Sequence, residues 1–279
     1  MATHQARSPE PLTVFVEGIG LLGPGLSNWP QGRACLDASV NFETARSVLP
    51  LPMALPAAER RRAGAVVKVA LAVAQEAVLA SGLQASALPS VFSSSNGDAV
   101  NCHEICSALA SNDRLISPTR FHNSVHNAAS GYWSISSGAM TSSSALCARD
   151  ASFAAGLLEA MTQVVVEGRA VLLVAYDTDY PEPMHSARPV PDSFGIALVL
   201  APQRGERSQA CWTLDPAACF ADAAASTLDN LALEHLRNSI PAARCLPLLR
   251  SVAIQSTGEV VLAYLQGIQL AVQVAPCRQ

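Results

Sequence analysis

Two unbroken apolar segments constrain the fold of this chain most strongly. Val171–Ala175 and Gly195–Ala201 contain only aliphatic residues and glycine, and turn-forming residues bound both. Short apolar segments of this kind are typical of strands that are buried on both faces of a sheet. Helices must then cover both faces, so the sequence predicts an α/β protein with a mixed sheet.

The longest helical pattern precedes these strands. In Pro56–Ser81 apolar residues recur at helical spacing, a proline opens the segment, and a glycine follows it. Its most apolar part, Ala63–Leu83, contains Lys68, Gln75 and Glu76. A spanning helix needs about 20 largely apolar residues, so we expect a buried core helix and no membrane span.

A glycine pattern follows the first predicted strand, Thr13–Glu17. Gly18, Gly20 and Gly23 form a GxGxxG pattern. A dinucleotide-binding fingerprint requires a helix that opens on these glycines, and Pro24 with the residues after it opposes one. We therefore interpret the segment as a strand that leaves through a glycine turn, and we expect no cofactor.

A polar, charged segment, Pro202–Gln209, divides the chain. Beyond it, Asp222–Ile240 has a helical apolar face, and Gln266-Gly267 precedes an alternating strand pattern. The sequence thus predicts a main domain over 12–201 and a C-terminal extension, a helix plus a β-hairpin, over 202–279.

Composition excludes several classes of function. The 279 residues are 50% hydrophobic, carry a net charge of −4 and include one lysine. Such a chain lacks the basic surface that binds nucleic acid. Its polar start does not resemble a secretion signal, and its eight cysteines lack the spacing of a disulfide scaffold. We expect a cytoplasmic protein with reduced, mostly buried thiols.

The most specific sequence segments support a family resemblance. They are Leu55–Arg62, Phe121–Trp133 and Ser152–Ala160. Over residues 12–201 the chain resembles the N-terminal half of the β-ketoacyl synthases, and in particular the short chain-length-factor subunits of type II polyketide systems that make aryl polyene pigments. The resemblance implies a thiolase-like fold, mostly one half, with layered αβα architecture, because the last 78 residues are too few for the second half.

The resemblance also locates the nucleophile position. In this family a cysteine occupies a strand-to-helix turn, and the gapless register places Asp150 there, with Cys147 three residues earlier. A carboxylate cannot form the acyl thioester, and its charge is favoured at a helix N-terminus. Only His185 and His235 follow, without the motifs of the two family histidines. The resemblance therefore implies no catalytic residue and no enzyme activity, with Cys147 as the fallback nucleophile.

The family's pairing mode predicts the partner surface. The strand before the nucleophile pairs with its counterpart across a two-fold axis, which here implies Thr141–Ala148, backed by the loop Phe121–Trp133. The implied interface residues are Phe121, His122, Asn123, His126, Asn127, Tyr132, Trp133, Thr141, Ser142, Ser143, Ser144, Ala145 and Leu146. Tyr132, Trp133 and Met140 are candidates for bulk in the wall of an acyl tunnel, although large apolar residues more often belong to the core.

Two groups of histidine and cysteine residues could be interpreted as metal ligands. Cys102, His103 and Cys106 lie within one helical turn, but no second Cys/His pair follows at zinc spacing. His122 and His126 are four residues apart among polar neighbours without an acidic ligand nearby. We expect a helix with buried thiols, hydrogen-bonded loop histidines and no metal.

Two charged groups have both a structural and a functional interpretation. Asp177, Asp179 and Glu182 cluster at the end of a strand and could bind a cation, but a solvated loop is favoured. Arg60–Arg62 could dock an acidic carrier protein, but a short charged run is usually a solvated helix face.

Three functions remain open at this point. The favoured one is a non-catalytic chain-length factor that forms a heterodimer with an active β-ketoacyl synthase, meets acyl carrier protein indirectly, and shapes the acyl tunnel in polyketide or fatty-acid-like biosynthesis. The second is a reduced condensing enzyme or acyltransferase that uses Cys147. The third is a decarboxylase in which Asp150 mimics an oxyanion.

Overall fold

The computed structural model describes residues 10–216 and 223–277. Within them the strands form one eight-stranded sheet in the order β3-β2-β4-β5-β1-β6-β8-β7. The strands are β1 (Leu12–Leu22), β2 (Ser90–Ser93), β3 (Ser143–Leu146), β4 (Val171–Asp177), β5 (Phe194–Ala201), β6 (Ala210–Leu214), β7 (Gly258–Leu265) and β8 (Ile268–Pro276). Strand β2 pairs in parallel with β3 and β4, and the other pairs are antiparallel, so the sheet is mixed as predicted.

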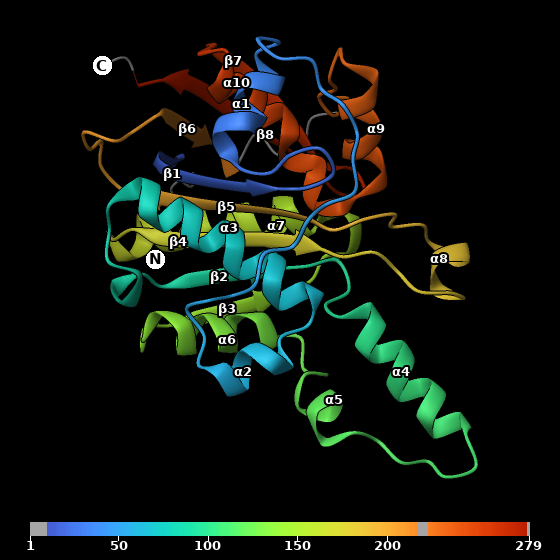
Figure 1. Cartoon of the computed structure of the whole chain (residues 1–279). Helices are drawn as coiled ribbons and strands as arrows, with labels where there is room; N and C mark the ends of the chain where they lie inside the picture. The colour runs from blue at the N-terminus through green and yellow to red at the C-terminus, as the bar shows by residue number, and fades with distance from the viewer. Residues whose placement is uncertain (1–9, 217–222, 278–279) are drawn as a thin grey trace, which may run out of the picture.

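Helices cover both faces of this sheet (Figure 1). The α-helices are α1 (Trp29–Leu36), α2 (Ala57–Arg62), α3 (Ala65–Ser81), α4 (Ala99–Ala110), α5 (Pro118–His122), α6 (Ala128–Ser137), α7 (Ser152–Glu167), α8 (Met184–Ala187), α9 (Leu231–Ser239) and α10 (Leu246–Ala253). The 3₁₀ helices are η1 (Ala85–Ala87), η2 (Arg149–Ala151) and η4 (Pro241–Cys245). One core lies under α3 and α6, and the other lies under α1, α7, α9 and α10. This arrangement is the predicted αβα layering.

Strand β4 shows why its sequence is apolar throughout. Val171 and Leu173 point into the core under α7, whereas Leu172, Val174 and Tyr176 point into the core under α3. Because successive side chains of a strand alternate between faces, a strand between two cores needs apolar residues at every position.

The GxGxxG segment is a strand packed closely against a helix. Strand β1 extends through Leu22, beyond the predicted end at Glu17, so Gly18 and Gly20 lie inside the strand. A Cβ at Gly18 would lie 2.0 Å from the carbonyl oxygen of Ala77, and one at Gly20 would lie 2.0 Å from that of Val73. These glycines allow α3 to approach β1.

The helix predicted over Pro56–Ser81 is two helices. Helix α2 ends at Arg62, Ala63 is extended, and Gly64 caps α3. No residue of α2 is buried, whereas α3 buries its apolar face against the sheet. Because the helix is interrupted at Ala63 and Gly64, only α3 packs along the sheet. No helix in the described part of the chain is long and apolar enough to cross a membrane.

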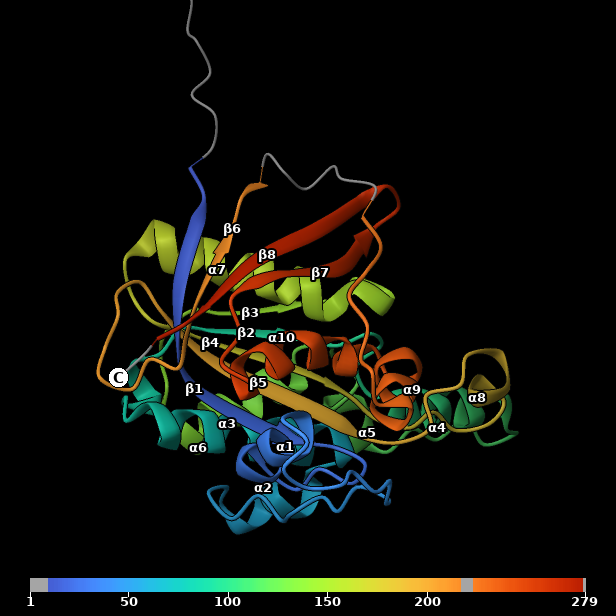
Figure 2. The ribbon, with the colours of Figure 1, turned by 90° about the horizontal axis from the view of Figure 1, so that it is seen from above.

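The C-terminal region continues the same sheet. Strand β6 pairs along β1, and the hairpin β7–β8 turns at Gly267, which has a φ of 75°, as predicted. Figure 2 shows these strands beside α7. The helix predicted from Asp222 is wrong in extent. Asp222 lies outside the described residues, and α9 begins at Leu231 because the Asn230 side chain accepts hydrogen bonds from the first turn.

Candidate functional site

A constrained turn joins β3 to α7. Arg149 has a φ of 51°, a left-handed conformation that is uncommon for residues other than glycine. The Ser152 hydroxyl accepts a hydrogen bond from the Ala148 amide at 2.9 Å and donates to the Arg149 carbonyl at 2.7 Å. The turn therefore holds Asp150 immediately before the first turn of α7.

Two guanidinium groups hold the Asp150 carboxylate. Arg188 donates to Oδ1 of Asp150, and Nη2 of Arg244 lies 3.7 Å from Oδ2. Arg188 also donates to the Tyr180 hydroxyl at 2.8 Å and to the Ser95 hydroxyl at 3.4 Å. Asp150 is thus fixed by an ion-pair network, although its side chain is 45% exposed.

A cavity of about 480 Å³ opens at this network. It is lined by Asp150, His185, Arg188, Pro189, Val190, Pro191, His235, Asn238, Ser239, Pro241 and Arg244. His185 lies on α8 and His235 on α9. The structure therefore brings both histidines to the cavity of Asp150, which the sequence analysis did not anticipate because neither carries a recognisable flanking motif.

Cys147 lies outside the lining of this cavity. Its side chain is exposed, and its thiol donates to the Ser95 carbonyl at 3.2 Å. Of the two residues proposed for the nucleophile position, Asp150 is therefore the one that faces the cavity.

Asp177 is a buried anchor behind the cavity, and the predicted solvated acidic loop is wrong for this residue. Its carboxylate accepts hydrogen bonds from the amides of Ser95 at 2.9 Å and Ala242 at 2.8 Å. Burial raises the pKa of Asp177 to about 6, and these hydrogen bonds oppose the shift. Asp177 thereby ties η4, which carries Arg244, to the loop after β2.

The other two acids of that predicted group bind elsewhere. Asp179 pairs with Arg46 at 2.6 Å, and Glu182 accepts hydrogen bonds from Ser186. The three carboxylates therefore each have separate protein partners.

The family is decided by a match that covers most of the chain. Residues 32–254 match the model described as "Beta-ketoacyl synthase, N-terminal domain". The chain belongs to this family. No curated protein matches the sequence.

Solved structures share the fold of this β-ketoacyl synthase N-terminal domain. A ketosynthase in complex with its chain length factor from Xenorhabdus doucetiae is 22% identical with a TM-score of 0.68, and the match covers 94% of this chain and 99% of that one. The ishigamide ketosynthase/chain length factor is 13% identical with a TM-score of 0.67, at 95% and 99% coverage. A type II polyketide synthase acyl carrier protein in complex with its ketosynthase is 12% identical with a TM-score of 0.72, at 95% and 99% coverage. The thiolase-like fold is thereby confirmed.

Strand β3 of this β-ketoacyl synthase domain lies at one edge of the described sheet and pairs with β2 on one side. It covers Ser143–Leu146, which is shorter than the predicted Thr141–Ala148. The Thr141 hydroxyl donates to the Leu88 carbonyl at 2.8 Å, and Ser142, Ser143 and Ala145 are exposed. The strand is therefore available for pairing at this edge.

The segment predicted as the loop Phe121–Trp133 is largely helical, because it contains the end of α5 and the first part of α6. Phe121, His122 and Asn127 are exposed, and His122 is the last residue of α5 rather than a loop residue. Asn123 is buried, donates to the Arg62 carbonyl at 3.0 Å and accepts from the Tyr132 hydroxyl at 3.1 Å. His126 lies in the turn between α5 and α6, with Nε2 3.0 Å from the Leu146 carbonyl oxygen. This hydrogen bond confirms the prediction for His126 and links the turn to β3.

The three candidates for a tunnel wall occupy different environments. Tyr132 and Trp133 are 3% and 2% exposed and pack in the core under α3, whereas Met140 is 97% exposed. Two of the candidates therefore contribute to the core of this domain, and one reaches solvent.

Helix α4 contradicts the prediction of buried thiols. Cys102 and Cys106 are exposed, and α4 buries only Ala99 and Asn101. Figure 1 shows α4 projecting from the body of the molecule next to α5. The helical spacing was predictable, but the absence of packing depends on tertiary structure. Overall, three of the seven described cysteines are buried, and all seven are free thiols.

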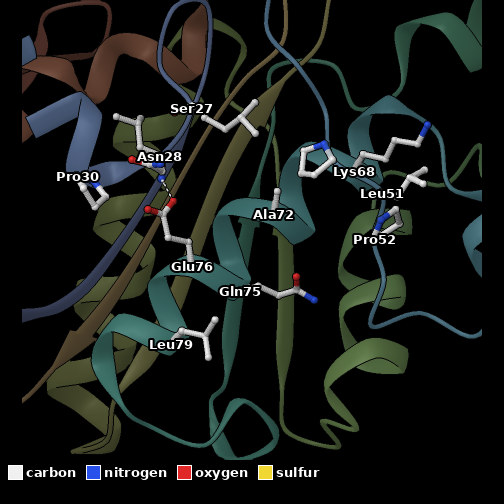
Figure 3. Close-up of a pocket in the computed structure, with 13 residues that line it drawn as sticks. Ser27, Asn28, Pro30, Leu51, Pro52, Lys68, Ala72, Gln75, Glu76 and Leu79 are labelled. Carbon is white, nitrogen blue, oxygen red and sulfur yellow. Dashed lines mark hydrogen bonds between the residues drawn. The ribbon is translucent and has the colours of Figure 1, made fainter.

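A second cavity, of about 460 Å³, lies beside α3 (Figure 3). Glu76 on its wall accepts hydrogen bonds from the amides of Leu21 at 2.9 Å and Trp29 at 2.7 Å, and burial raises its pKa. This carboxylate holds the start of α1 against α3.

The arginines of α2 lie on a solvated helix face, as predicted for Arg60–Arg62. No residue of α2 is buried, and Arg62 pairs with Glu59 at 3.1 Å.

Proposed function

We propose that this chain is a non-catalytic chain-length-factor subunit. It forms a heterodimer with an active β-ketoacyl synthase in a type II polyketide system of the aryl polyene kind and shapes the acyl tunnel of its partner. Family membership and a fold shared with ketosynthase and chain-length-factor complexes support the proposal.

The observation that carries the proposal is the position of Asp150. It occupies the constrained turn before α7, lines the cavity, and pairs with Arg188 and Arg244. An acyl thioester needs a thiolate at the reacting position, and Cys147 does not line this cavity. No observation favours Cys147 as a nucleophile.

A free sheet edge supports pairing with a second protein. Strand β3 is a ready template for an added strand, and several large apolar side chains in residues 115–140, the segment that precedes it in the chain, are exposed. They are Leu115 (79%), Phe121 (68%), Val125 (53%), Ile135 (51%) and Met140 (97%). Exposed apolar groups of this size on one end of a molecule are typical of protein interfaces.

Within this interface Met140 is the best candidate for a tunnel-wall residue. It is the one of the three candidates whose side chain is free to enter a partner, because Tyr132 and Trp133 fill the core. Helices α4 and α5 contact each other and carry the exposed side chains of Leu109 and Phe121.

Acyl transfer tests the absence of catalysis. The purified chain, incubated with an acyl thioester, is expected to remain unmodified in intact-mass measurements, while an active ketosynthase in the same assay gains the acyl group. A variant with Cys102→Ser and Cys106→Ser removes two other exposed thiols. Selective acylation of Cys147 in this variant would overturn the proposal and favour a reduced condensing enzyme.

A further inference from the structure

The cavity at Asp150 has more positive than negative charge. Arg188 and Arg244 share one carboxylate, that of Asp150. The charge of Asp177 also acts on Arg188, but this carboxylate is buried, is bound by the amides of Ser95 and Ala242, and does not line the cavity. Glu234 on α9 is occupied, because Arg237 donates to both of its oxygens at 2.6 and 2.7 Å and lowers its pKa to about 2. Among the residues that line the cavity, the two guanidinium groups therefore share one carboxylate, that of Asp150.

Of the two arginines, Arg244 is the one whose guanidinium group lacks a hydrogen-bond acceptor. Its side chain is 28% exposed, and its contact with Asp150 at 3.7 Å is beyond hydrogen-bond distance. None of the described residues accepts a hydrogen bond from it. Burial lowers the pKa of Arg244, Asp150 opposes this, and the nearby charges of Arg237 and Arg188 lower it further. A half-buried guanidinium without an acceptor is costly, and an oxyanion would supply the acceptor.

The frame around Arg244 is rigid. It lies on η4, whose neighbouring residues Ala242, Ala243 and Cys245 are completely buried, and the Asp177 carboxylate fixes the Ala242 amide at 2.8 Å. The Arg244 side chain therefore extends into the cavity from a fixed backbone, so a ligand there would need little rearrangement of the protein.

The remaining walls suit a small anion. His185 on α8 and His235 on α9 offer ring N–H donors from two sides, and Figure 2 shows these two helices at the same end of the sheet. Pro189, Val190 and Pro191 form an apolar wall. Guanidinium groups bind phosphate and carboxylate in a bidentate geometry.

We propose that this cavity binds a small oxyanion, a phosphate or a carboxylate group, through Arg244 and the two histidines. Arg188 remains with Asp150, which competes for Arg244 in the absence of the ligand. This inference concerns the isolated chain and does not depend on its pairing with a ketosynthase.

Calorimetric titration of the full chain tests the proposal, with sodium phosphate in one series and sodium succinate in another at constant ionic strength. Saturable binding of either anion is expected, and the tighter of the two identifies the ligand class. Arg244→Gln is expected to weaken binding at least about tenfold, the effect of losing one charge-assisted hydrogen bond of about 1.4 kcal/mol or more.

Two further variants keep the test independent of folding defects. Asp150→Asn removes the competing carboxylate and is expected to tighten binding. Arg250→Gln, on α10, is the control, because Arg250 is 40% exposed, pairs with Asp229 and is outside the cavity lining. The inference is overturned if neither anion binds the wild type and Asp150→Asn in a saturable manner, or if Arg250→Gln weakens binding as much as Arg244→Gln.

Discussion

At the scale of single residues, the proposed non-catalytic role predicts that a thiol in place of Asp150 is not sufficient for condensation. The cavity around it contains two arginines and two histidines, and the ion pairs that now fix the carboxylate would lose their partner. We expect Asp150→Cys to fold but to produce no condensation product from acyl and malonyl carrier proteins, as measured by mass spectrometry. Robust condensation by this variant without a partner would refute a non-catalytic role.

Asp177 predicts a pH dependence of stability. Burial raises its folded-state pKa to about 6, whereas an unfolded aspartate has a pKa of about 3.9. The folded protein therefore holds a proton that the unfolded chain releases, so this group's contribution to the free energy of unfolding falls by roughly 2–3 kcal/mol as the pH rises from about 4 to about 6.

Urea titrations at pH 4 to 7 measure that contribution. Asp177→Asn has no carboxyl group to titrate, so its free energy of unfolding is expected to fall less over this range than that of the wild type. Asp229→Asn is the matched control, because the Asp229 side chain is 91% exposed, and it is expected to follow the wild type. Equal slopes for wild type and Asp177→Asn would disprove the assignment.

At the scale of elements, the backbone of β1 lies so close to the backbone of α3 that the contact leaves no room for a side chain at Gly20. A methyl group at Gly20 would collide with the Val73 carbonyl at 2.0 Å. Gly20→Ala is expected to destabilise the protein by about 3 kcal/mol or more, at the upper end of overpacking effects. Gly131→Ala is the control on α6, where nothing lies within 4 Å, and it is expected to stabilise by roughly 0.5–1 kcal/mol. Thermal unfolding that shows equal effects for both variants would contradict this packing.

The β3 end of the molecule predicts a second effect at this scale. Phe121 and Met140 are 68% and 97% exposed, so Phe121→Glu and Met140→Glu together are expected to leave folding intact and to weaken binding to a ketosynthase at least about tenfold, because buried charges are costly. Leu231→Glu on α9 is the control, since Leu231 is 84% exposed and α9 lies far from β3 (Figure 1). Surface-plasmon resonance distinguishes these variants, and unchanged binding of the double variant would exclude this surface.

At the scale of the whole molecule, sequence predicted what local patterns determine. The apolar segments of β4 and β5 predicted a doubly covered sheet because each residue of such strands meets a core. Sequence did not predict the break at Gly64 or the convergence of His185 and His235 on Asp150. Those features depend on how segments far apart in the chain pack together, and no local pattern encodes them.

The central claim is that this chain functions as half of a heterodimer. The most direct measurement is the native mass of the chain, first alone and then co-expressed with a ketosynthase from its own gene neighbourhood. We expect a 1:1 complex whose mass is the sum of the two chains. A stable homodimer that is indifferent to the ketosynthase would contradict the account.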